Sequence, residues 1–485
     1  MALNVARRKN PTGIGKVSVS ARSPLWLTVA LAASGCVAYA PKPVQPLAIA
    51  SAQQTRTLLD PEVCVELHRL SATKDCTDTN PDRLDLLAAA IALNPAVAAS
   101  TAAVRTAETD AAAARVRPSA VLTLSAEYAN DPTTSSPWLY GLAVDQPLDL
   151  GQRRKGRVQL ADAKVALARL DRLEALWTLR MTLRKAESDL AAATQERSAF
   201  SELVALRERQ LAAANRRLTE GEISRAEVDR LRAEASSDTT RRLDAERRRS
   251  AALADLSGGL GVPVAQLASL TLGWPDFGAP ARLSDGEIGA LSAAATAGRP
   301  AILRAMVEYD QSETTLRTAV GEQFPALNVS VGYTWERGLV KLPASIGLAL
   351  PPADLNRAAI RAAEAGRTEA GARLEEAVHK VGVDIDAARV AYRSAWNALD
   401  TIRTTTLITA QSLAAQADRE IEAGAIDRVD WASAQIASSQ ARLDELTALA
   451  QVRLSESQLE DALRTPLSGP EQAVGLQTLQ NETRR

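Results

Sequence analysis

Side chains that could carry metal or thiol chemistry are few in this chain of 485 residues. It has two histidines, His68 and His379, and three cysteines, Cys36, Cys64 and Cys76. A zinc enzyme needs three protein ligands close together, and a thiol nucleophile needs a neighbouring base. Serine and aspartate are plentiful, but no nucleophile elbow, P-loop or HExxH motif arranges them for catalysis. We therefore predict a protein that is not an enzyme, with no catalytic residue, metal site or cofactor.

Cys36 ends a leader with the order of a secretory signal. Basic residues come first, an apolar stretch follows at 25–33, and small residues lead up to Cys36. The ending Ala-Ser-Gly-Cys resembles a bacterial lipobox, in which the cysteine is lipidated and becomes the first mature residue. It departs from that pattern at Ala33, where leucine is usual. We predict a signal peptide at 1–35, lipidation of Cys36 and a lipid-anchored linker at 36–79; the alternative is an ordinary signal cleaved near Cys36.

The other two cysteines lie close together in a polar segment of the predicted linker. An exported protein meets an oxidising compartment, so a small disulfide loop between Cys64 and Cys76 is one interpretation and two free thiols are the other. A metal site that also uses His68 lacks an obvious fourth ligand. His379 has no companion ligand, and we interpret it as a surface or packing residue.

The chain from residue 80 onwards contains an internal repeat of two similar units in tandem. Landmarks recur at an offset of about 205 residues: Pro95 and Pro300, Pro118 and Pro325, DLGQRRKGR from Asp149 and DLNRAAIRA from Asp354, Gly221 and Gly424. Alanine-rich composition could align two helices, but it would not align prolines, strand pairs and glycine turns in the same order. We predict structural repeats at 80–282 and 283–465, and a polar C-terminal tail at 466–485.

Each repeat is predicted to contain short helices, two strands and a very long helical hairpin. No proline occurs between Leu148 and Val262 or between Ala353 and Thr465, so little interrupts helix there. A helix of about 68 residues before each tip glycine would be about 100 Å long. The expected segments are strands at about 119–130, 137–147, 325–336 and 343–351, and hairpins at about 150–257 and 355–465.

The long helices of the two predicted hairpins, which we call the rods, carry the heptad spacing of a coiled-coil seam. Small alanines at many seam positions would let neighbouring helices approach closely. The seam residues are Leu176, Leu179, Leu183, Ala186, Leu190 and Ala193 in the first repeat, and Leu374, Val378, Val381, Ile385, Ala388, Tyr392, Ala395, Leu399 and Ile402 in the second.

The predicted strands alternate apolar residues with small or polar residues. A soluble sheet with one face on a core would show the same alternation. A membrane barrel is favoured by strand lengths of about ten residues and by aromatic residues at the hairpin ends, where an interfacial girdle would lie. These aromatic residues are Tyr128, Trp138, Tyr140, Tyr333 and Trp335.

Four strands cannot close a barrel, and open sheet edges are not tolerated in lipid. The chain must therefore oligomerise if its strands cross a membrane. Two copies would give eight strands, a barrel that side chains fill. A water-filled channel therefore predicts three copies or more.

The chain resembles the TolC-like outer-membrane efflux channel family over residues from about 80 to about 465. The resemblance lies in the duplicated strand–strand–hairpin unit, in QPLDLGQRRKGRV from Gln146, and in Gly221 and Gly424 at the hairpin tips. It implies a mainly α fold with a membrane β-barrel: a homotrimer with a 12-stranded barrel in outer-membrane lipid on a long periplasmic α-helical barrel. It also implies a passive exit duct for drugs or metal ions. Its partners would be a periplasmic membrane-fusion adaptor and an inner-membrane resistance-nodulation-division pump.

The resemblance also implies a gate at the periplasmic mouth, ringed by acidic residues just after the second tip glycine. Asp430 is the matching position, and Asp427 is the alternative. Ser433 stands where a second acid is often found. The hairpin tips, Leu218–Ser224 and Ile421–Asp427, are expected to contact the adaptor.

Two other functions remain open from the residues. A type I secretion channel for polypeptides would share the same architecture. A periplasmic coiled-coil adaptor or structural protein would differ, because adaptors usually carry one hairpin between lipoyl-like β-domains. Net charge of −1 argues against nucleic acid as a partner.

Overall fold

The computed structural model describes residues 39–473, apart from 72–73, 75, 77–79, 129, 131–136, 149–151, 269, 271, 273, 275 and 337. The predicted signal peptide, Cys36 and the end of the predicted tail lie outside the described residues. The chain divides into two compact units, Met1–Ser51 and Ala52–Arg485. Residues 39–45 lead into helix α2 (Pro46–Gln54), which has no buried residue.

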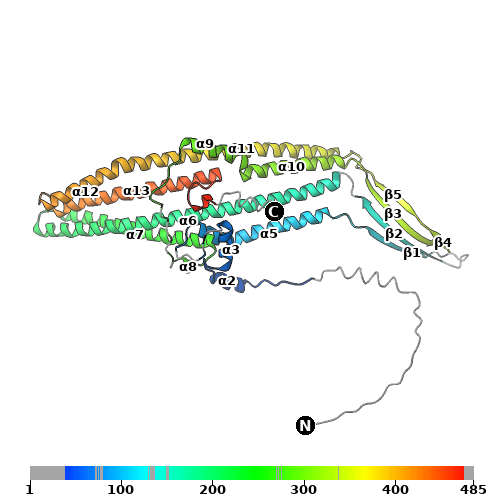
Figure 1. Cartoon of the computed structure of the whole chain (residues 1–485), viewed down its shortest axis with the longest axis horizontal. Helices are drawn as coiled ribbons and strands as arrows, with labels where there is room; N and C mark the ends of the chain where they lie inside the picture. Colours follow the sequence, from blue (N-terminus) through cyan, green and yellow to red (C-terminus); the bar gives the residue numbers. More distant parts are fainter. Residues whose placement is uncertain are drawn as a thin grey trace, which may run out of the picture. The chain divides into compact units, whose positions relative to one another are not determined.

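The second unit contains two copies of one arrangement, and the internal duplication and mainly helical fold are confirmed (Figure 1). The first copy follows α3 (Pro61–Leu70) and consists of α4 (Arg83–Leu93), α5 (Pro95–Arg115), β1 (Val121–Tyr128), β2 (Trp138–Leu148), α6 (Gln152–Glu220) and α7 (Arg225–Leu260). After α8 (Val264–Ala268), the second consists of α9 (Asp285–Gly298), α10 (Pro300–Gly321), β3 (Ala326–Glu336), β4 (Leu339–Lys341), β5 (Ala344–Ala349), α11 (Arg357–Thr401), η1 (Ile402–Thr406), α12 (Leu407–Glu422) and α13 (Arg428–Leu463). The described chain ends in a 3₁₀ turn, η2 (Pro470–Ala473).

Proline marks the corresponding helix starts in both copies. Pro95 and Pro300 occupy the first turn of α5 and α10, where a missing N–H costs nothing and the fixed φ suits a helix. The helices before them, α4 and α9, each begin with a reciprocal capping box, on Asp82 and Ser284. Among the described helices none is by itself long and apolar enough to cross a membrane; α4 and α5 meet that criterion only together, across a bend of 55°.

The described strands all belong to one antiparallel sheet at one end of the second unit (Figure 1). β2 of the first copy pairs with β3 of the second, with Leu142 opposite Tyr333. The fourth predicted strand is split in two: β4 and β5 both pair with β3, and the carbonyl of Pro343 between them accepts a hydrogen bond from Gly332 N at 2.8 Å. The outer edges of β1 and of β4 and β5 pair with no other described strand.

Each copy has its own hydrophobic core along its rods. In the first, all six predicted seam residues of α6 are buried, as predicted, and the five from Leu176 to Leu190 pack in one cluster with residues of α4 and α7. In the second, the seam from Val381 to Leu399 is buried against α9 and α13, but Val378 is 43% exposed. A third cluster joins the copies, with Leu203 of α6 packed near Leu443 of α13.

The first rod is one uninterrupted α-helix of 69 residues, but the second is not uniform. A π-helical segment, η1, separates α11 from α12. Arg403 of this segment donates to Glu445 of α13 at 2.8 Å and to the carbonyl of Gly278 at 2.9 Å. The wider turn is therefore held by contacts on either side.

A buried layer of charge joins the two copies where α6 and α13 cross the middle of the unit. Arg184, 1% exposed, lies 3.1 Å from Glu456 and 2.8 Å from Glu460. Arg180 donates to Glu460 at 3.2 Å, and Arg453 pairs with Glu456 at 2.9 Å. In the low-dielectric interior, such charges are tolerated only while they are paired.

Aromatic and acidic neighbours complete this ionic layer. The guanidinium of Arg83 lies 4.0 Å and that of Arg453 4.8 Å from the centre of the Trp274 ring, which is within cation–π range. Burial, together with the nearby charge of Glu471, raises the pKa of Glu187 to about 8. Burial also raises the pKa of Glu460, and the facing guanidiniums of Arg184 and Arg180 oppose that rise.

We expect Glu460→Gln to lower the free energy of unfolding by about 3 kcal/mol, because it removes the buried carboxylate charge that faces both Arg180 and Arg184. Urea unfolding of the full chain in detergent measures the change. Glu369→Gln is the control: its pair with Arg373 is exposed, and its loss should cost less than about 0.5 kcal/mol. Equal effects of the two substitutions would contradict a structural role for the ionic layer.

Candidate functional site

One face of the sheet is apolar and uncovered. Because the strands pair in register, Leu124 lies opposite Leu142, and Leu142 lies opposite Tyr333. Leu124 is 74% exposed, and Ile346 on β5 is 69% exposed. The other face carries small and polar residues such as Ser125, Gly141 and Ser330. A soluble sheet would bury its apolar face, so the arrangement fits a surface that meets an apolar medium.

The predicted girdle residues lie together on this apolar face, near the turns of the sheet. Tyr128 and Trp138 are opposite each other, with ring centres 5.1 Å apart. Trp138 stacks on Tyr140 at 6.1 Å, and Tyr140 stacks on Trp335 at 6.0 Å. Tyr333 lies on the same face and is 41% exposed. The five rings form a band across three strands, as interfacial aromatic residues do.

The two hairpin tips lie at the other end of the rods (Figure 1). Gly221 and Gly424 have φ of +81° and +71°, the left-handed conformation that glycine adopts without strain. The returning helices are capped by side chains: Ser224 accepts from Glu227 N at 3.2 Å, and Asp427 accepts from Val429 N at 2.7 Å. The sequence therefore makes both tips as tight, capped turns.

Asp427 also ties the two hairpins to each other. One oxygen of its carboxylate caps α13, and the other lies 2.6 Å from the guanidinium of Arg217 on α6. Gln210 of α6 donates to the hydroxyl of Ser433 at 2.8 Å. Asp427 and Ser433 are thus engaged with the neighbouring hairpin of the same chain.

Asp430, the predicted gate residue, differs from Asp427 because its side chain is not bound to any described residue of the neighbouring hairpin. Its side chain is exposed and makes no hydrogen bond or ion pair with another described residue, although its backbone N–H donates to Asp427 at 2.8 Å. Asp418 on the preceding helix accepts from Trp431 at 2.7 Å and Gln435 at 2.8 Å. Of these three acids near the second tip, Asp430 is the one that is free to meet an ion or another molecule.

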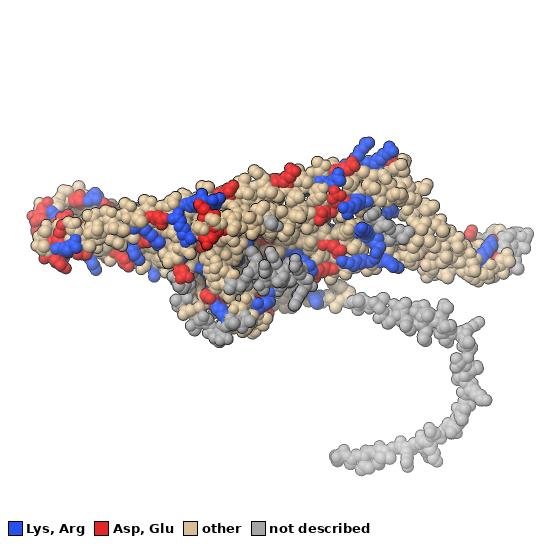
Figure 2. Space-filling model, turned by 45° about the horizontal axis from the view of Figure 1, so that its top comes forward, with Lys and Arg blue, Asp and Glu red and all other residues tan. Residues whose placement is uncertain are grey.

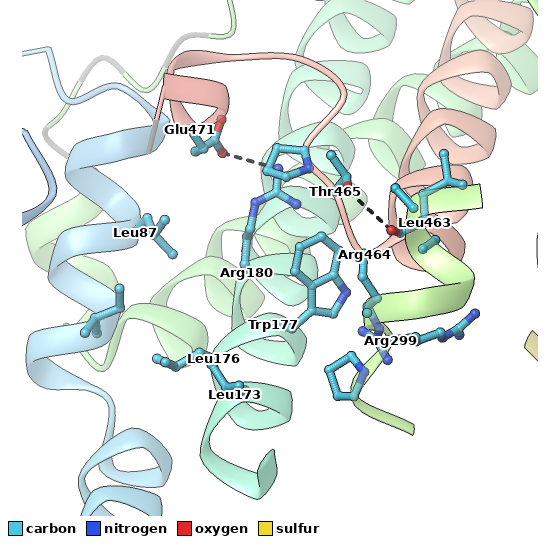
Figure 3. A pocket seen from close by; sticks show the side chains of 16 residues that line it. Leu87, Leu173, Leu176, Trp177, Arg180, Arg299, Leu463, Arg464, Thr465 and Glu471 are labelled. Carbon is cyan, nitrogen blue, oxygen red and sulfur yellow. Dashed lines mark hydrogen bonds and ion pairs between the residues drawn. The ribbon is translucent and has the colours of Figure 1, made fainter. Parts of the chain in front are cut away.

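A cavity of about 190 Å³ lies between the copies, beside the ionic layer (Figure 3). Leucine, alanine and proline make up half of its lining residues, and Arg180, Arg299 and Arg464 also line it. The hydroxyl of Thr465 donates to the carbonyl of Leu463 at 3.2 Å. No histidine or cysteine is among its lining residues.

The described cysteines and histidines form no metal site. Cys64 and Cys76 are joined by a disulfide, with their Cα atoms 5.4 Å apart. His68 is exposed and its Nδ1 lies 2.7 Å from the carbonyl oxygen of Cys64, while His379 is exposed on α11. Across the described residues, no three His, Cys, Asp or Glu side chains are grouped to hold a metal ion.

Sequence analysis did not identify two features of this geometry. The ionic layer was not predicted because Arg184 and Glu460 lie far apart along the chain and neither belongs to a pattern with distinctive spacing. Arg217 was missed because a lone arginine before a tip glycine gives no signal of its partner. Only the alignment of the two repeats could have suggested the Arg217–Asp427 pair, because it predicts that the two hairpin tips lie side by side.

Comparison with known proteins agrees with this architecture. The sequence model of the family described as "Outer membrane efflux protein" matches residues 86–262 and 291–463. Among solved structures, the outer membrane protein VceC of Vibrio cholerae is 15% identical (TM-score 0.64; 79% of this chain, 95% of that one). MtrE of Neisseria gonorrhoeae is 17% identical (0.63; 79% and 89%), and CmeC of Campylobacter jejuni is 14% identical (0.63; 86% and 94%). No curated protein matches this chain.

We expect Asp427→Asn to loosen the tips without unfolding them. Asparagine keeps the cap of α13 but loses the charge that pairs with Arg217. Because this pair is about a third exposed, amide hydrogen exchange in the last turn of α6 should rise only about two- to threefold. Asp229→Asn is the control, since Asp229 pairs only within α7. Unchanged exchange in Asp427→Asn would contradict a tie between the hairpins.

Proposed function

This chain belongs to the outer membrane efflux protein family, and on that premise we propose that three copies form the exit duct of a tripartite efflux pump. It is an outer-membrane channel with a periplasmic helical extension, and it is not an enzyme. The duct would pass drugs or metal ions that an inner-membrane resistance-nodulation-division pump and a periplasmic adaptor deliver to it. Energy is spent at the pump, and this chain supplies a passive path.

The uncovered apolar face of the sheet is the observation that carries this proposal. Strands of up to 11 residues, tilted, match the thickness of a bilayer core. Their apolar side chains would meet lipid, and the small polar face with Ser125 and Ser330 would line a wet lumen. The aromatic band at the turns would lie at the membrane surface far from the helices.

The unpaired sheet edges support the number of copies. In lipid, the backbone groups of β1 and of β4 and β5 need partners, which further copies can supply. Two copies would make a barrel filled by its own side chains, whereas three make a twelve-stranded one with a lumen. The predicted seam residue Val378 and, twelve residues further along α11, Val390 are exposed in the single chain, which supports a further helical contact.

Conductance across a planar bilayer tests the channel, and a pair of substitutions tests the facing of its strands. Val331→Arg should cost about 2–4 kcal/mol of stability if the side chain lies near the middle of the bilayer. Ser330→Arg should fold and should change single-channel conductance, because it adds a charge to the lumen. Equal tolerance of both arginines together with no conductance would refute the membrane channel.

We propose Asp430 as the gate residue of the periplasmic mouth, and Asp427 as the residue that holds the tips in place. The exposed, unpaired carboxylate of Asp430 supports the first role, and the bond of Asp427 to Arg217 supports the second. Three Asp430 carboxylates around a narrow mouth would attract cations and repel anions. The tips around Gly221 and Gly424 would contact the adaptor.

We expect Asp430→Ala to weaken the block of single-channel current by divalent cations from the periplasmic side. Assembly should be intact, because the residue lies outside the seams. Glu227→Ala is the matched control: Glu227 occupies the same third position of its helix in the first hairpin, and its carboxylate already pairs with Arg230 at 2.6 Å. A block that is lost in Asp427→Ala but kept in Asp430→Ala would place the gate one turn earlier.

We propose that the mature chain begins at a lipidated Cys36. Metabolic labelling with palmitate should mark the wild-type protein, and Cys36→Ser should abolish the label. The barrel would itself hold the chain in the membrane, so outer-membrane fractionation of Cys36→Ser is expected to persist. Labelling that survives in Cys36→Ser would rule out lipidation at this position.

A further inference from the structure

Basic side chains without partners gather where the helices meet the strands. Arg117 lies between α5 and β1, Lys155 in the first turn of α6, and Arg357 and Arg361 in the first turns of α11. All four are exposed, and none makes a side-chain hydrogen bond or ion pair with another described residue. Two come from each copy, although they do not stand at matching positions of the two repeats. We call these four residues the junction cations.

Three acidic residues near this level are already engaged. Asp162 pairs with Arg115 at 2.5 Å, and Glu313 pairs with Arg367 at 3.3 Å. Asp354 accepts the backbone N–H groups of Asn356 and Ala358, each at 3.1 Å. These acids have partners of their own, and the charge of the junction cations therefore remains directed to solvent.

Other arginines of this region have a structural role that the junction cations lack. Arg157 donates to the carbonyl of Ala114 at 3.1 Å, and Arg154 donates to that of Arg115 at 3.4 Å, both at the end of α5. Arg153 donates to the carbonyl of Phe324, just after α10, at 3.3 Å. These contacts satisfy helix C-termini, where cations are favoured. Capping therefore explains three arginines but not the junction cations.

The junction cations lie directly beyond an uncharged band. On the strands, the charged residues Glu127, Glu336 and Lys341 lie near the turns, and Asp145 lies opposite Ser330 on the small and polar face. Figure 2 shows this arrangement on one face, with Lys and Arg gathered where the helices end and a largely uncharged surface over the strands. If the apolar face lies in the membrane, the junction cations lie at the level of the headgroups on the helix side.

We propose that the junction cations bind the headgroups of anionic phospholipids in the leaflet nearest the rods. This inference rests on the proposed membrane function. Cations next to a membrane span attract anionic lipid through the phosphate and the net negative charge of its headgroup. Arginine and lysine also reach phosphate oxygens with charge-assisted hydrogen bonds. Three copies would present twelve such cations as a ring, which would fix the depth of the barrel from the periplasmic side.

Lipid retention by the purified full chain tests the proposal. Native mass spectrometry would count dioctanoyl phosphatidylglycerol and dioctanoyl phosphatidylcholine retained from detergent. We expect the wild-type protein to prefer phosphatidylglycerol. The variant Arg117→Glu/Lys155→Glu/Arg357→Glu/Arg361→Glu should lose at least about tenfold of that preference, given a contribution of about fivefold per cation. Salt should weaken the wild-type preference, because exposed charges are screened.

The matched control is Arg209→Glu/Arg216→Glu/Lys380→Glu/Arg442→Glu. It also reverses three arginines and one lysine, two in each copy, at exposed positions that make no side-chain bond with another described residue and lie away from the junction. The control should keep the wild-type preference. If the reversal variant fails to assemble, the same four junction positions changed to glutamine provide a second variant with the same expected loss.

Three outcomes would overturn the proposal. They are equal retention of both lipids by the wild-type protein, an unchanged preference in an assembled junction variant, and an equal loss in the control. The outcome for the channel is separate. A wild-type protein that retains both lipids equally and still conducts would leave the proposed function intact, whereas retention of neither lipid and no conductance would refute the membrane channel itself.

Discussion

The charges of Arg184, Glu456 and Glu460 cannot reach water, and this constraint determines how the two hairpins fit together. If α6 slid along α13 by one turn, buried guanidiniums and carboxylates would lose their partners, at a cost of several kcal/mol. The same number of residues separates Arg184 from Arg217 on α6 and Asp427 from Glu460 on α13, about 50 Å at the helical rise. The register set by the ionic layer therefore brings the cross-hairpin pair together at the tips.

The rods also separate two chemically different ends. At one end an apolar face with aromatic rings suits contact with lipid, and at the other exposed acids and capped turns suit water, ions and protein partners. Alanine along the seams keeps the helices thin and closely packed over this distance, so that few bulky side chains are needed. The middle of the molecule, with the ionic layer, has the structural task of keeping the two ends in a fixed relation.

Much of the architecture could be predicted because it follows local periodicity. The 69-residue helix α6, its six buried seam residues and the alternation of β3 all follow from spacing that is visible in one stretch of sequence. The split of the fourth strand was not predicted, although Pro343 stands at the break and cannot donate to a ladder. The positions of Asp427 and Asp430 were taken from resemblance, but the partner of Asp427 depends on a contact between distant segments that no local pattern encodes.

The π-helical segment η1 has a consequence for the numbering of the second seam. Before it, Ile385, Ala388, Tyr392, Ala395 and Leu399 are buried with heptad spacing, and continuation of that spacing would bury residues 413 and 416. The buried residues of α12 are instead Ala414 and Ala417, each one position later. A π turn accommodates one extra residue in an α-helix, so η1 has the form of a single-residue insertion that the helix absorbed by widening one turn. The second rod thus keeps its face toward α13 despite a shift of reading frame in its heptads, and deletion of one residue within 402–406 would return the rod to a continuous α-helix with an unshifted stripe.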